Sequence, residues 1–186
     1  MTAVPRPSGP PTAVWGMWIL IATESMLFAA FIATYYYLRF HTAAWPPAGV
    51  SEPRVVVPIV LALVLALTSI PVHLASKAAQ ARDVRRARVF ILDALVVQTG
   101  YFAYQAYAFD ASTIGQNAYT SIYYILLGGD HAHVFLGLLF SVWLLARLSG
   151  GLTTYRVNAT RAIAWYWHFV NVLTLVVTAV LLSARA

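Results

Sequence analysis

The stretch WGMWILIATESMLFAAFIATYYYLRF, residues 15–40, places one carboxylic acid, Glu24, inside an otherwise apolar run. At about 1.5 Å per helical residue the stretch forms a rod of roughly 39 Å, which crosses a hydrocarbon core of about 30 Å with some tilt. An ionisable group at that depth costs at least about 2.5 kcal/mol on insertion scales. We therefore expect the other parts of the chain to surround Glu24 with protein contacts or a wet cavity.

The composition describes a membrane protein. Charged residues make up 10% and hydrophobic residues 61% of the 186 residues, whereas soluble domains average about 25% charged residues. The net charge of +6 comes from basic residues between the apolar runs, which favours a topology signal over a nucleic-acid surface. Because the chain has no cysteine, disulfides, iron–sulfur clusters and thiolate copper sites are excluded.

Four further apolar runs follow the first, at residues 55–75, 89–109, 121–148 and 162–183. Each is long enough to span a bilayer as a helix. The sequence thus predicts an all-α integral membrane bundle of five transmembrane helices, forming one domain over residues 15–186 behind a disordered, Pro-rich arm at residues 1–14. Gly128 and Gly129 indicate a weak point inside the fourth helix. No internal repeat is visible, which disfavours a transporter built from inverted repeats.

Basic residues set the expected orientation. Nine of the twelve Lys and Arg residues fall on one side of the predicted topology, namely Arg6, Lys77, Arg82, Arg85, Arg86, Arg88, Arg147, Arg156 and Arg161. The other side has Arg39, Arg54 and Arg185. Since the basic side of a membrane protein faces the cytoplasm, we expect a cytoplasmic N-terminus and, after five spans, an external C-terminus.

Several costly polar groups gather in the inner half of this predicted bundle. They are Glu24, His73, Asp93, Asp130, His133, His168 and Asn171. The simplest way to satisfy them is one shared polar layer that faces the cytoplasmic side. Two roles stay open for Glu24 at this point: a proton-handling site, or a neutral acid that hydrogen-bonds a neighbouring helix.

The histidines raise the question of a cofactor. Asp130 and His133 share a helix face, so a metal site would need Glu24 and His168 from other helices. A haem would need facing histidines at matched depth, and His133 with His168 is the only rough match. Neither pattern is specific. The aromatic clusters at residues 35–37 and 165–167 are typical of interfacial belts.

Several motifs of the sequence resemble a known family, the short five-helix bacterial form of haem–copper oxidase subunit III. The resemblance rests on motifs that occur in the family's order over residues 15–182: the first helix with its Ser/Thr-Glu pair, AAWPPAG at 43–49, Thr68-Ser69 before His73, Gln105-Ala-Tyr, Tyr119-Thr-Ser, His133-Val, and TRAIAWYWHFVNV at 160–172. Each motif is weak alone. Their shared order and the span count make the resemblance strong.

The chain also departs from the family pattern at five positions. These are Ala108 for an acid, Asp130 for a histidine, His131 for a glycine, Asn171 for an aspartate and Thr174 for a tryptophan. The departures indicate a divergent branch. We hypothesise that Asp130 supplies the negative charge that is absent at position 108 or 171.

The resemblance implies an accessory subunit of a respiratory cytochrome c oxidase in the bacterial plasma membrane. It would have no catalytic residue and no cofactor of its own, and would be part of an oxygen-reducing, proton-translocating enzyme only within the complex. Haem and copper would lie in the partner subunits I and II, with direct packing on subunit I and phospholipid in a cleft between helix pairs. The polar residues above, together with Gln105, would form the proton environment or touch subunits and lipid.

Other functions stay open from the sequence. The nearest is subunit III of a quinol oxidase or the related accessory protein of nitric oxide reductases, because other subunits recognise the electron donor. Two functions belong to other classes: a b-type membrane cytochrome that uses His133 and His168, and a small transporter that uses Glu24.

Overall fold

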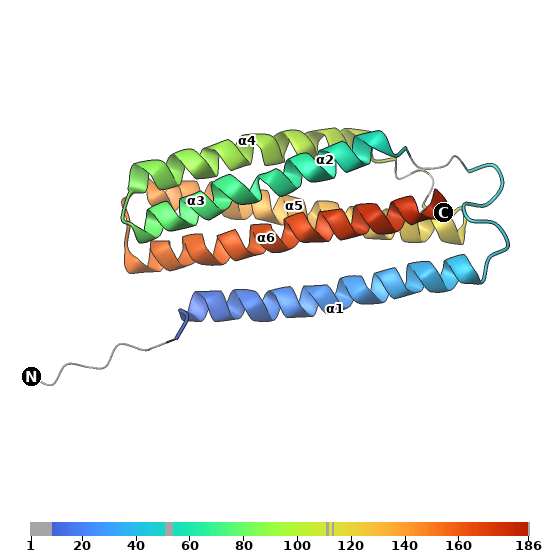
Figure 1. Ribbon diagram of the computed structural model, residues 1–186, viewed down its shortest axis with the longest axis horizontal. Coiled ribbons are helices and arrows are strands. Elements are labelled where there is room, and N and C mark those ends of the chain that lie inside the picture. The colour runs from blue at the N-terminus through green and yellow to red at the C-terminus, as the bar shows by residue number, and fades with distance from the viewer. Residues whose placement is uncertain (1–8, 51–53, 111, 113, 186) are drawn as a thin grey trace, which may run out of the picture.

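The computed structural model describes residues 9–50, 54–110, 112 and 114–185. Its helices are α1 (Thr12–Phe40), α2 (Val56–Leu67), α3 (Ser69–Gln80), α4 (Val84–Ala108), α5 (Ala118–Leu148) and α6 (Thr154–Leu182), with the short 3-10 helix η2 (Ser183–Arg185) at the end. Helices α2 and α3 run on as one rod, so the chain crosses the length of the bundle five times (Figure 1). The all-helical architecture predicted from the sequence is confirmed in the described part of the chain.

Four of these rods meet the length and hydropathy expected of a membrane span. They are Thr12–Phe40, Val56–Gln80, Ala118–Leu148 and Thr154–Leu182. The fifth rod, α4, is less apolar because it carries Arg85, Arg86 and Arg88 in its first turns and Asp93 further along. The chain is therefore a helical membrane protein in which α4 is the most polar of the crossing helices.

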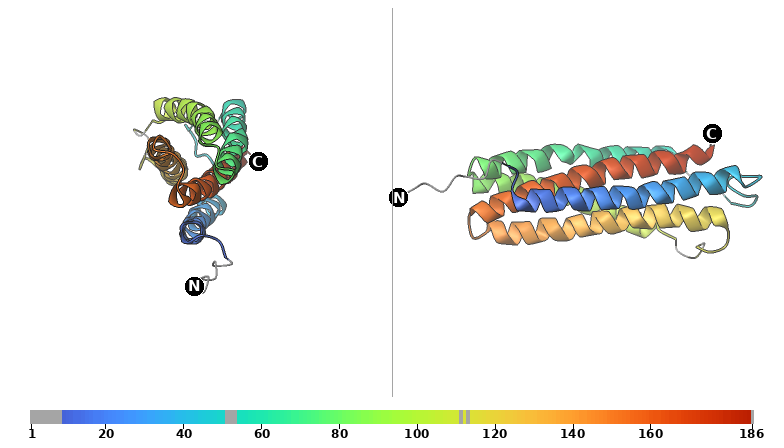
Figure 2. Two further views of the ribbon diagram at one scale, coloured as in Figure 1. Left: turned by 90° about the vertical axis from the view of Figure 1, so that its left-hand side faces the viewer. Right: turned by 90° about the horizontal axis from the view of Figure 1, so that it is seen from below.

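Helix α6 is the central element of the bundle. It contacts α1, α2, α3 and α5, whereas α1 contacts only α5 and α6 among the described elements. Viewed end-on, α4, α5, α6 and the α2–α3 rod form a ring, and α1 stands outside it against α5 and α6 (Figure 2). Helix α1 is thus the least covered part of the fold.

The helices extend beyond the apolar runs that predicted them. Helix α1 already begins at Thr12, inside the range 1–14 where the sequence predicts the arm; residues 1–8 lie outside the described part. Helices α4, α5 and α6 begin at Val84, Ala118 and Thr154, which is earlier than the apolar runs that predicted them. Helix α3 ends at Gln80, which is later than its run. Polar residues cap these three starts: the side chains of Asp83, Asn117 and Thr153 each accept a backbone N–H of the next turn. Hydropathy alone ends a helix too early, since charged residues continue it outside the apolar zone.

The α2–α3 rod is interrupted at Thr68. Pro71 lacks the N–H that would bond the carbonyl of Leu67, and its ring crowds that same carbonyl. The last residue of α2 is accordingly Leu67, and the Thr68 hydroxyl donates instead to the carbonyl of Leu65 at 2.6 Å. The break places Thr68 and Ser69 against the middle of the bundle.

Glycines in α5 allow close approach and do not weaken the helix. Helix α5 is continuous through Gly128 and Gly129, so the predicted weak point is wrong. A Cβ at Gly129 would lie 3.2 Å from the ring of Phe28, and one at Gly137 only 2.7 Å from Trp167. These positions let α1 and α6 pack directly on the α5 backbone.

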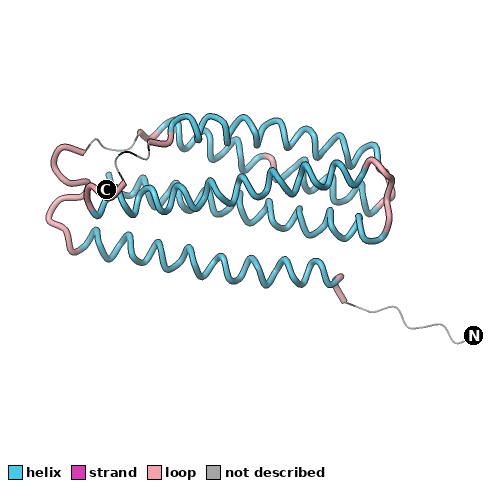
Figure 3. The backbone as a smooth tube through the Cα atoms, turned by 180° about the vertical axis from the view of Figure 1, so that it is seen from behind, coloured by secondary structure: helices cyan, strands magenta, loops and turns pink. Residues whose placement is uncertain are grey.

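The loops lie at the two ends of the helical bundle, and the two ends differ in the length of their loops (Figure 3). Short turns at 81–83 and 149–153 join helices at the end that we call the basic end, where Lys77, Arg82, Arg85, Arg86, Arg88, Arg147, Arg156 and Arg161 gather. Longer connections at 41–55 and 109–117 join them at the opposite, long-loop end. Helix α1 begins at the basic end and α6 finishes at the long-loop end, as an odd number of crossings requires.

Candidate functional site

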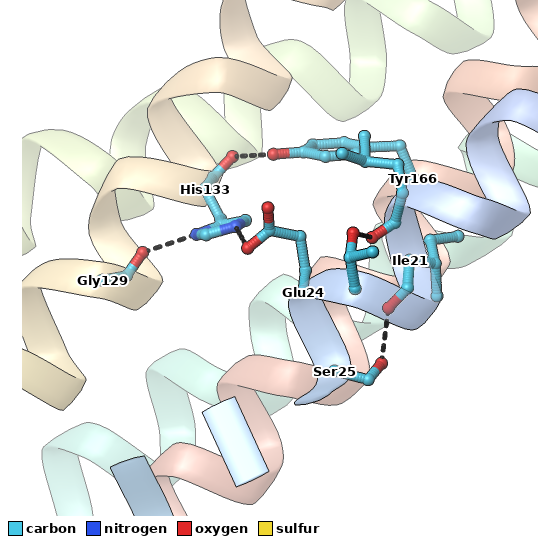
Figure 4. Close-up of polar contacts among 8 residues, drawn as sticks. Ile21, Glu24, Ser25, Gly129, His133 and Tyr166 are labelled. Atoms are coloured by element: carbon cyan, nitrogen blue, oxygen red, sulfur yellow. Dashed lines mark hydrogen bonds and ion pairs between the residues drawn. The ribbon is translucent and has the colours of Figure 1, made fainter. Parts of the chain in front are cut away.

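Glu24 faces His133 across the seam between α1 and α5 (Figure 4). The carboxylate Oε2 lies 3.1 Å from the imidazole Nε2, and the side chains are 26% and 16% exposed, respectively. The other ring nitrogen, Nδ1, lies 2.8 Å from the carbonyl oxygen of Gly129 one turn earlier in α5. Both nitrogens of His133 are therefore engaged, and Glu24 meets a polar partner within the protein as the sequence predicts.

The two contacts of His133 can both be hydrogen bonds in only some of its protonation forms. A carbonyl only accepts hydrogen bonds, so Nδ1 of His133 must carry a proton to bond Gly129. The second contact then has two forms: an imidazolium donating to a carboxylate, or a neutral imidazole accepting from a carboxylic acid. Either form holds one proton between Glu24 and His133 and has no net charge. A pair of this kind is suited to the apolar depth at which Glu24 lies, roughly 18 Å along α1.

Helix α6 holds the pair in place. The Tyr166 hydroxyl donates to the backbone carbonyl of His133 at 2.9 Å, and Phe28 and Phe169 lie edge-on to the His133 ring at 5.2 and 6.5 Å between centroids. Ser25, beside Glu24 in the sequence, instead donates to Ile21 of its own helix at 2.7 Å. The pair is thus assembled from three helices, and Ser25 is not part of it.

A second polar cluster joins α4, α5 and α6. The Thr174 hydroxyl donates to Oδ1 of Asp130 at 2.8 Å, and Asp130 is buried. Gln105 donates to the hydroxyl of Tyr101 at 3.1 Å, and Tyr101 lies near Asp130 and Thr174. Two of the positions that depart from the family pattern, 130 and 174, are therefore direct hydrogen-bond partners.

A third cluster surrounds the helix break. The Thr68 hydroxyl accepts from Gln98 at 3.2 Å and from Asn171 at 3.3 Å, and Asn171 also donates to Ser69 at 2.8 Å. Thr68 lies at the break between α2 and α3, Ser69 begins α3, Gln98 lies in α4 and Asn171 lies in α6. The break thus provides a buried hub that links the α2–α3 rod to α4 and to α6.

The remaining predicted site residues lie elsewhere. His73 and His168 pair with each other between α3 and α6, with ring centroids 5.9 Å apart. Asp93 lies on the exposed face of α4, away from every cluster above. The single shared polar layer predicted from the sequence is therefore wrong: the groups form separate clusters, because each pair of neighbouring helices satisfies its own polar residues.

The aromatic belts are only partly as predicted. Trp165 and Tyr37 are exposed, but Tyr35, Tyr166 and Trp167 are fully buried. Trp167 donates to Ser141 at 2.9 Å, and Tyr35 accepts from Trp45 at 3.1 Å. Consecutive helical residues point about 100° apart, so a run of three aromatic residues cannot lie on one face. The run Trp165-Tyr166-Trp167 therefore indicates from the sequence that at least one of these rings faces the bundle interior, where Tyr166 contacts His133.

The structure also bears on the cofactor alternatives. Glu24 and His133 meet, but His168 is not part of their site, and the described residues contain no group of three or more His, Asp or Glu side chains that could hold a metal ion. A haem ligand needs a free imidazole nitrogen. His133 would have to give up Gly129 or Glu24 to provide one.

The fold and the site define an all-helical membrane protein with a half-buried carboxylate–imidazole pair between α1 and α5. A family profile for cytochrome c oxidase subunit III matches residues 12–182, so the chain belongs to that family. The resemblance inferred from the motifs is confirmed. Membership makes the chain an accessory subunit of a haem–copper oxidase.

Bacterial relatives support this assignment. The cytochrome c oxidase subunit 3 of Thermostichus vulcanus is 26% identical over 171 residues, covering 90% of this chain and 85% of the relative. The probable cytochrome c oxidase subunit 3 of Nocardia farcinica is 29% identical over 164 residues, covering 84% and 80%. The cytochrome c oxidase subunit 3 of Bacillus sp. strain PS3 is 27% identical over 165 residues, covering 84% of this chain and 78% of the relative.

Proposed function

We propose that this chain packs directly on the oxygen-reducing subunit I of a cytochrome c oxidase in the bacterial plasma membrane. The basic end faces the cytoplasm, as the positive-inside rule requires. Haem and copper belong to subunits I and II, and this chain contributes protein and lipid contacts. Its function is to stabilise the catalytic subunit and the proton-uptake side of the enzyme during aerobic electron transport.

The exposed face of α1 supports this proposal most directly. Ile19 and Met26 are 63% and 76% exposed, and between them α1 turns Glu24 inward onto His133. An apolar helix face meets lipid or another apolar helix equally well, but helix association in membranes favours small residues that let backbones approach. The outward side of α1 has such residues at Ala22, Ala29, Ala30 and Ala33. Helix α1 is therefore the element that we assign to the contact with subunit I.

The Glu24–His133 pair, on the inward side of α1, has a separate chemical role. Because one side chain or the other carries the single shared proton, the pair keeps its hydrogen bonds while the charge of its neighbours changes. A neutral, polar group next to a proton-uptake region stabilises water and protons there without adding a fixed charge. We assign the pair to the maintenance of proton uptake over many turnovers.

Removal and return of the chain test the proposal. The oxidase is stripped of this chain with stronger detergent, and the number of turnovers before inactivation is compared with that of the intact complex. We expect the stripped enzyme to start at a similar rate but to inactivate several-fold sooner, and the added chain to restore the lifetime. An unchanged lifetime after complete removal would overturn the stabilising role.

A further inference from the structure

The interior of the helical ring is polar near the middle of the bundle. Across the ring, α4 does not contact α6, and α5 contacts neither α2 nor α3 among the described elements (Figure 2). Polar side chains occupy the space between them at two neighbouring levels. These are the hub of Thr68, Ser69, Gln98 and Asn171 and, one helical turn nearer the long-loop end, the cluster of Tyr101, Asp130 and Thr174. Both levels are separate from the Glu24–His133 pair between α1 and α5.

Two amide oxygens in the hub have no partner in the described part of the chain. Gln98 and Asn171 are 0% and 2% exposed, and both donate an amide N–H to the Thr68 hydroxyl. Their oxygens, Oε1 and Oδ1, are buried and accept no hydrogen bond from a described residue. Turning the Gln98 amide over would not help, because the Thr68 hydroxyl already donates to Leu65. Since buried acceptors without a partner are costly, both oxygens call for a donor or a cation from outside the chain.

The neighbouring level contains a buried carboxylate. Asp130 is 1% exposed, lies roughly 18 Å along α5 and accepts a hydrogen bond from Thr174 at 2.8 Å. No Lys or Arg among the described residues forms an ion pair with it. His133 lies near Asp130 on the same helix, but its two ring nitrogens are engaged elsewhere. Because a lone charge is costly at this depth, Asp130 must take up either a proton or a cation.

A cation satisfies both levels at once, whereas a proton does not. A proton on Asp130 would give nothing to the amide oxygens one turn away. Asn171 and Thr174 are three residues apart on α6, so their Cβ atoms are about 5–6 Å apart. An ion that binds oxygen at about 2.3–2.6 Å, as Ca²⁺ does and as Na⁺ of similar size can, fits between such levels. Hard cations prefer oxygen ligands, and with a single carboxylate a monovalent ion leaves the site neutral.

A cavity brings water close to this position. It has a volume of about 390 Å³ and lies at the long-loop end, where Gln105 and Thr178 are part of its lining. Gln105 donates to Tyr101, and Thr178 follows Thr174 by one turn on α6. Arg54 lines the same cavity, so we expect a cation to exchange slowly by this route.

We propose that the ring interior binds one sodium ion between Asp130 and the hub. The carboxylate of Asp130 and the amide oxygens of Gln98 and Asn171 are its ligands from the chain, and water completes its coordination shell. The ion neutralises the buried carboxylate and links α4, α5 and α6 across the ring. The site belongs to this chain alone and does not depend on the contact with subunit I.

The test compares sodium with N-methylglucamine, a cation too large for the site, on the purified full chain with whatever partners co-purify. Binding of radioactive sodium is counted after long equilibration, and thermal unfolding is recorded in the two chloride salts at equal ionic strength. We expect the unfolding midpoint to rise by about 3–6 °C at a tenfold excess of sodium over its Kd. Equal midpoints in the two salts would overturn the proposal and leave the amide oxygens to water.

Two variants assign the bound sodium to this site. Asp130→Asn removes the charge and should abolish the binding of one sodium ion per chain. Gln98→Met removes one amide oxygen, keeps the length of the side chain and should weaken that binding about tenfold, so it also serves as the test if Asp130→Asn does not fold. Wild-type sodium binding in the folded variants would contradict the proposal. A variant that is less stable but keeps the sodium-dependent rise in midpoint would show a purely structural role and would also contradict it.

Matched controls separate this site from general effects. Asp93→Asn removes an acid on the exposed face of α4. Gln80→Met removes an amide that bonds Ser76 of its own helix. Both should bind sodium as the wild type does, and a loss of sodium binding in either control would argue against the assigned position. Oxidase subunits that co-purify in any of these outcomes leave the proposed function standing.

Discussion

Single protons and single hydroxyl groups determine the polar chemistry of this chain. Glu24 and His133 share one proton because Gly129 requires the other ring nitrogen to donate. The neighbouring Asp130 is satisfied separately by Thr174. Substitutions that keep shape and change one proton or one hydroxyl group are therefore the informative ones.

Glu24→Gln is expected to leave assembly intact and to shorten sustained turnover. The amide keeps a hydrogen bond to His133 but cannot exchange a proton with it, so the pair loses its second protonation form. The measurement is oxidase activity over long assays, reported as turnovers before inactivation. Ser25→Ala is the control, because Ser25 bonds only its own helix, and it should behave as wild type. Wild-type kinetics over long assays in Glu24→Gln would favour a packing role for Glu24.

Asp130→Asn tests whether the carboxylate of Asp130 supplies the negative charge that the family pattern has at position 108 or 171 and that Ala108 and Asn171 lack. Asparagine still accepts a hydrogen bond from Thr174, so the substitution removes the charge and keeps the contact. We expect a lower yield of assembled complex and a lower turnover. Thr174→Val is the complementary variant, which leaves a buried carboxylate oxygen without its donor and should cost about 1–3 kcal/mol of stability. If Asp130→Asn changes neither yield nor turnover, the compensation hypothesis fails.

Among the helices, the contact between α5 and α6 depends on Gly137. A Cβ there would lie 2.7 Å from the Trp167 ring, which Ser141 holds by a hydrogen bond of 2.9 Å. We expect Gly137→Ala to destabilise the chain by about 1–3 kcal/mol through overpacking. Gly100→Ala is the matched control, because no atom lies within 4 Å of the added Cβ, and helix propensity should make it neutral or stabilising by up to about 1 kcal/mol. Thermal unfolding in detergent distinguishes them, and equal melting temperatures would contradict the packing argument.

The helix break at Thr68 makes a related prediction. Thr68→Val keeps the side-chain shape but removes the hydroxyl that accepts from Gln98 and Asn171. Since interhelical hydrogen bonds in membranes contribute about 0.6 kcal/mol on average and up to about 1.7, we expect a loss of about 1–2 kcal/mol. Thr23→Val removes a hydroxyl that bonds only Leu20 of its own helix and should cost less. The same unfolding assay decides, and a Thr23→Val variant that is as unstable as Thr68→Val would argue against the hub.

The sequence predicted the helices better than the contacts between them. Apolar length located all five rods, but it missed their charged ends, such as the turns of α6 before Ala162, because hydropathy does not register an N-cap like Thr153. It placed Glu24 in a protein environment, yet it did not identify His133 as the specific partner. That choice depends on how α1 and α5 are rotated about their axes, which the packing of Gly129 on Phe28 determines.

At the scale of the whole molecule, the helical fold and the family are established by this chain's own structure and sequence. Its position in the oxidase complex is a proposal. Five crossings, the central α6 and the match over residues 12–182 all describe this chain by itself. The orientation rests on the basic end, and the contact with subunit I on the exposed face of α1.

Separation of this chain from its complex tests whether the chain is an accessory subunit that holds no haem of its own. The chain is isolated in mild detergent, the subunits that accompany it are identified, and the reduced-minus-oxidised spectrum is recorded before and after this chain is stripped away. We expect haem to stay with a larger partner and the separated chain to be colourless. Haem absorbance that follows the separated chain would contradict this expectation and would make His133 and His168 ligands to be tested.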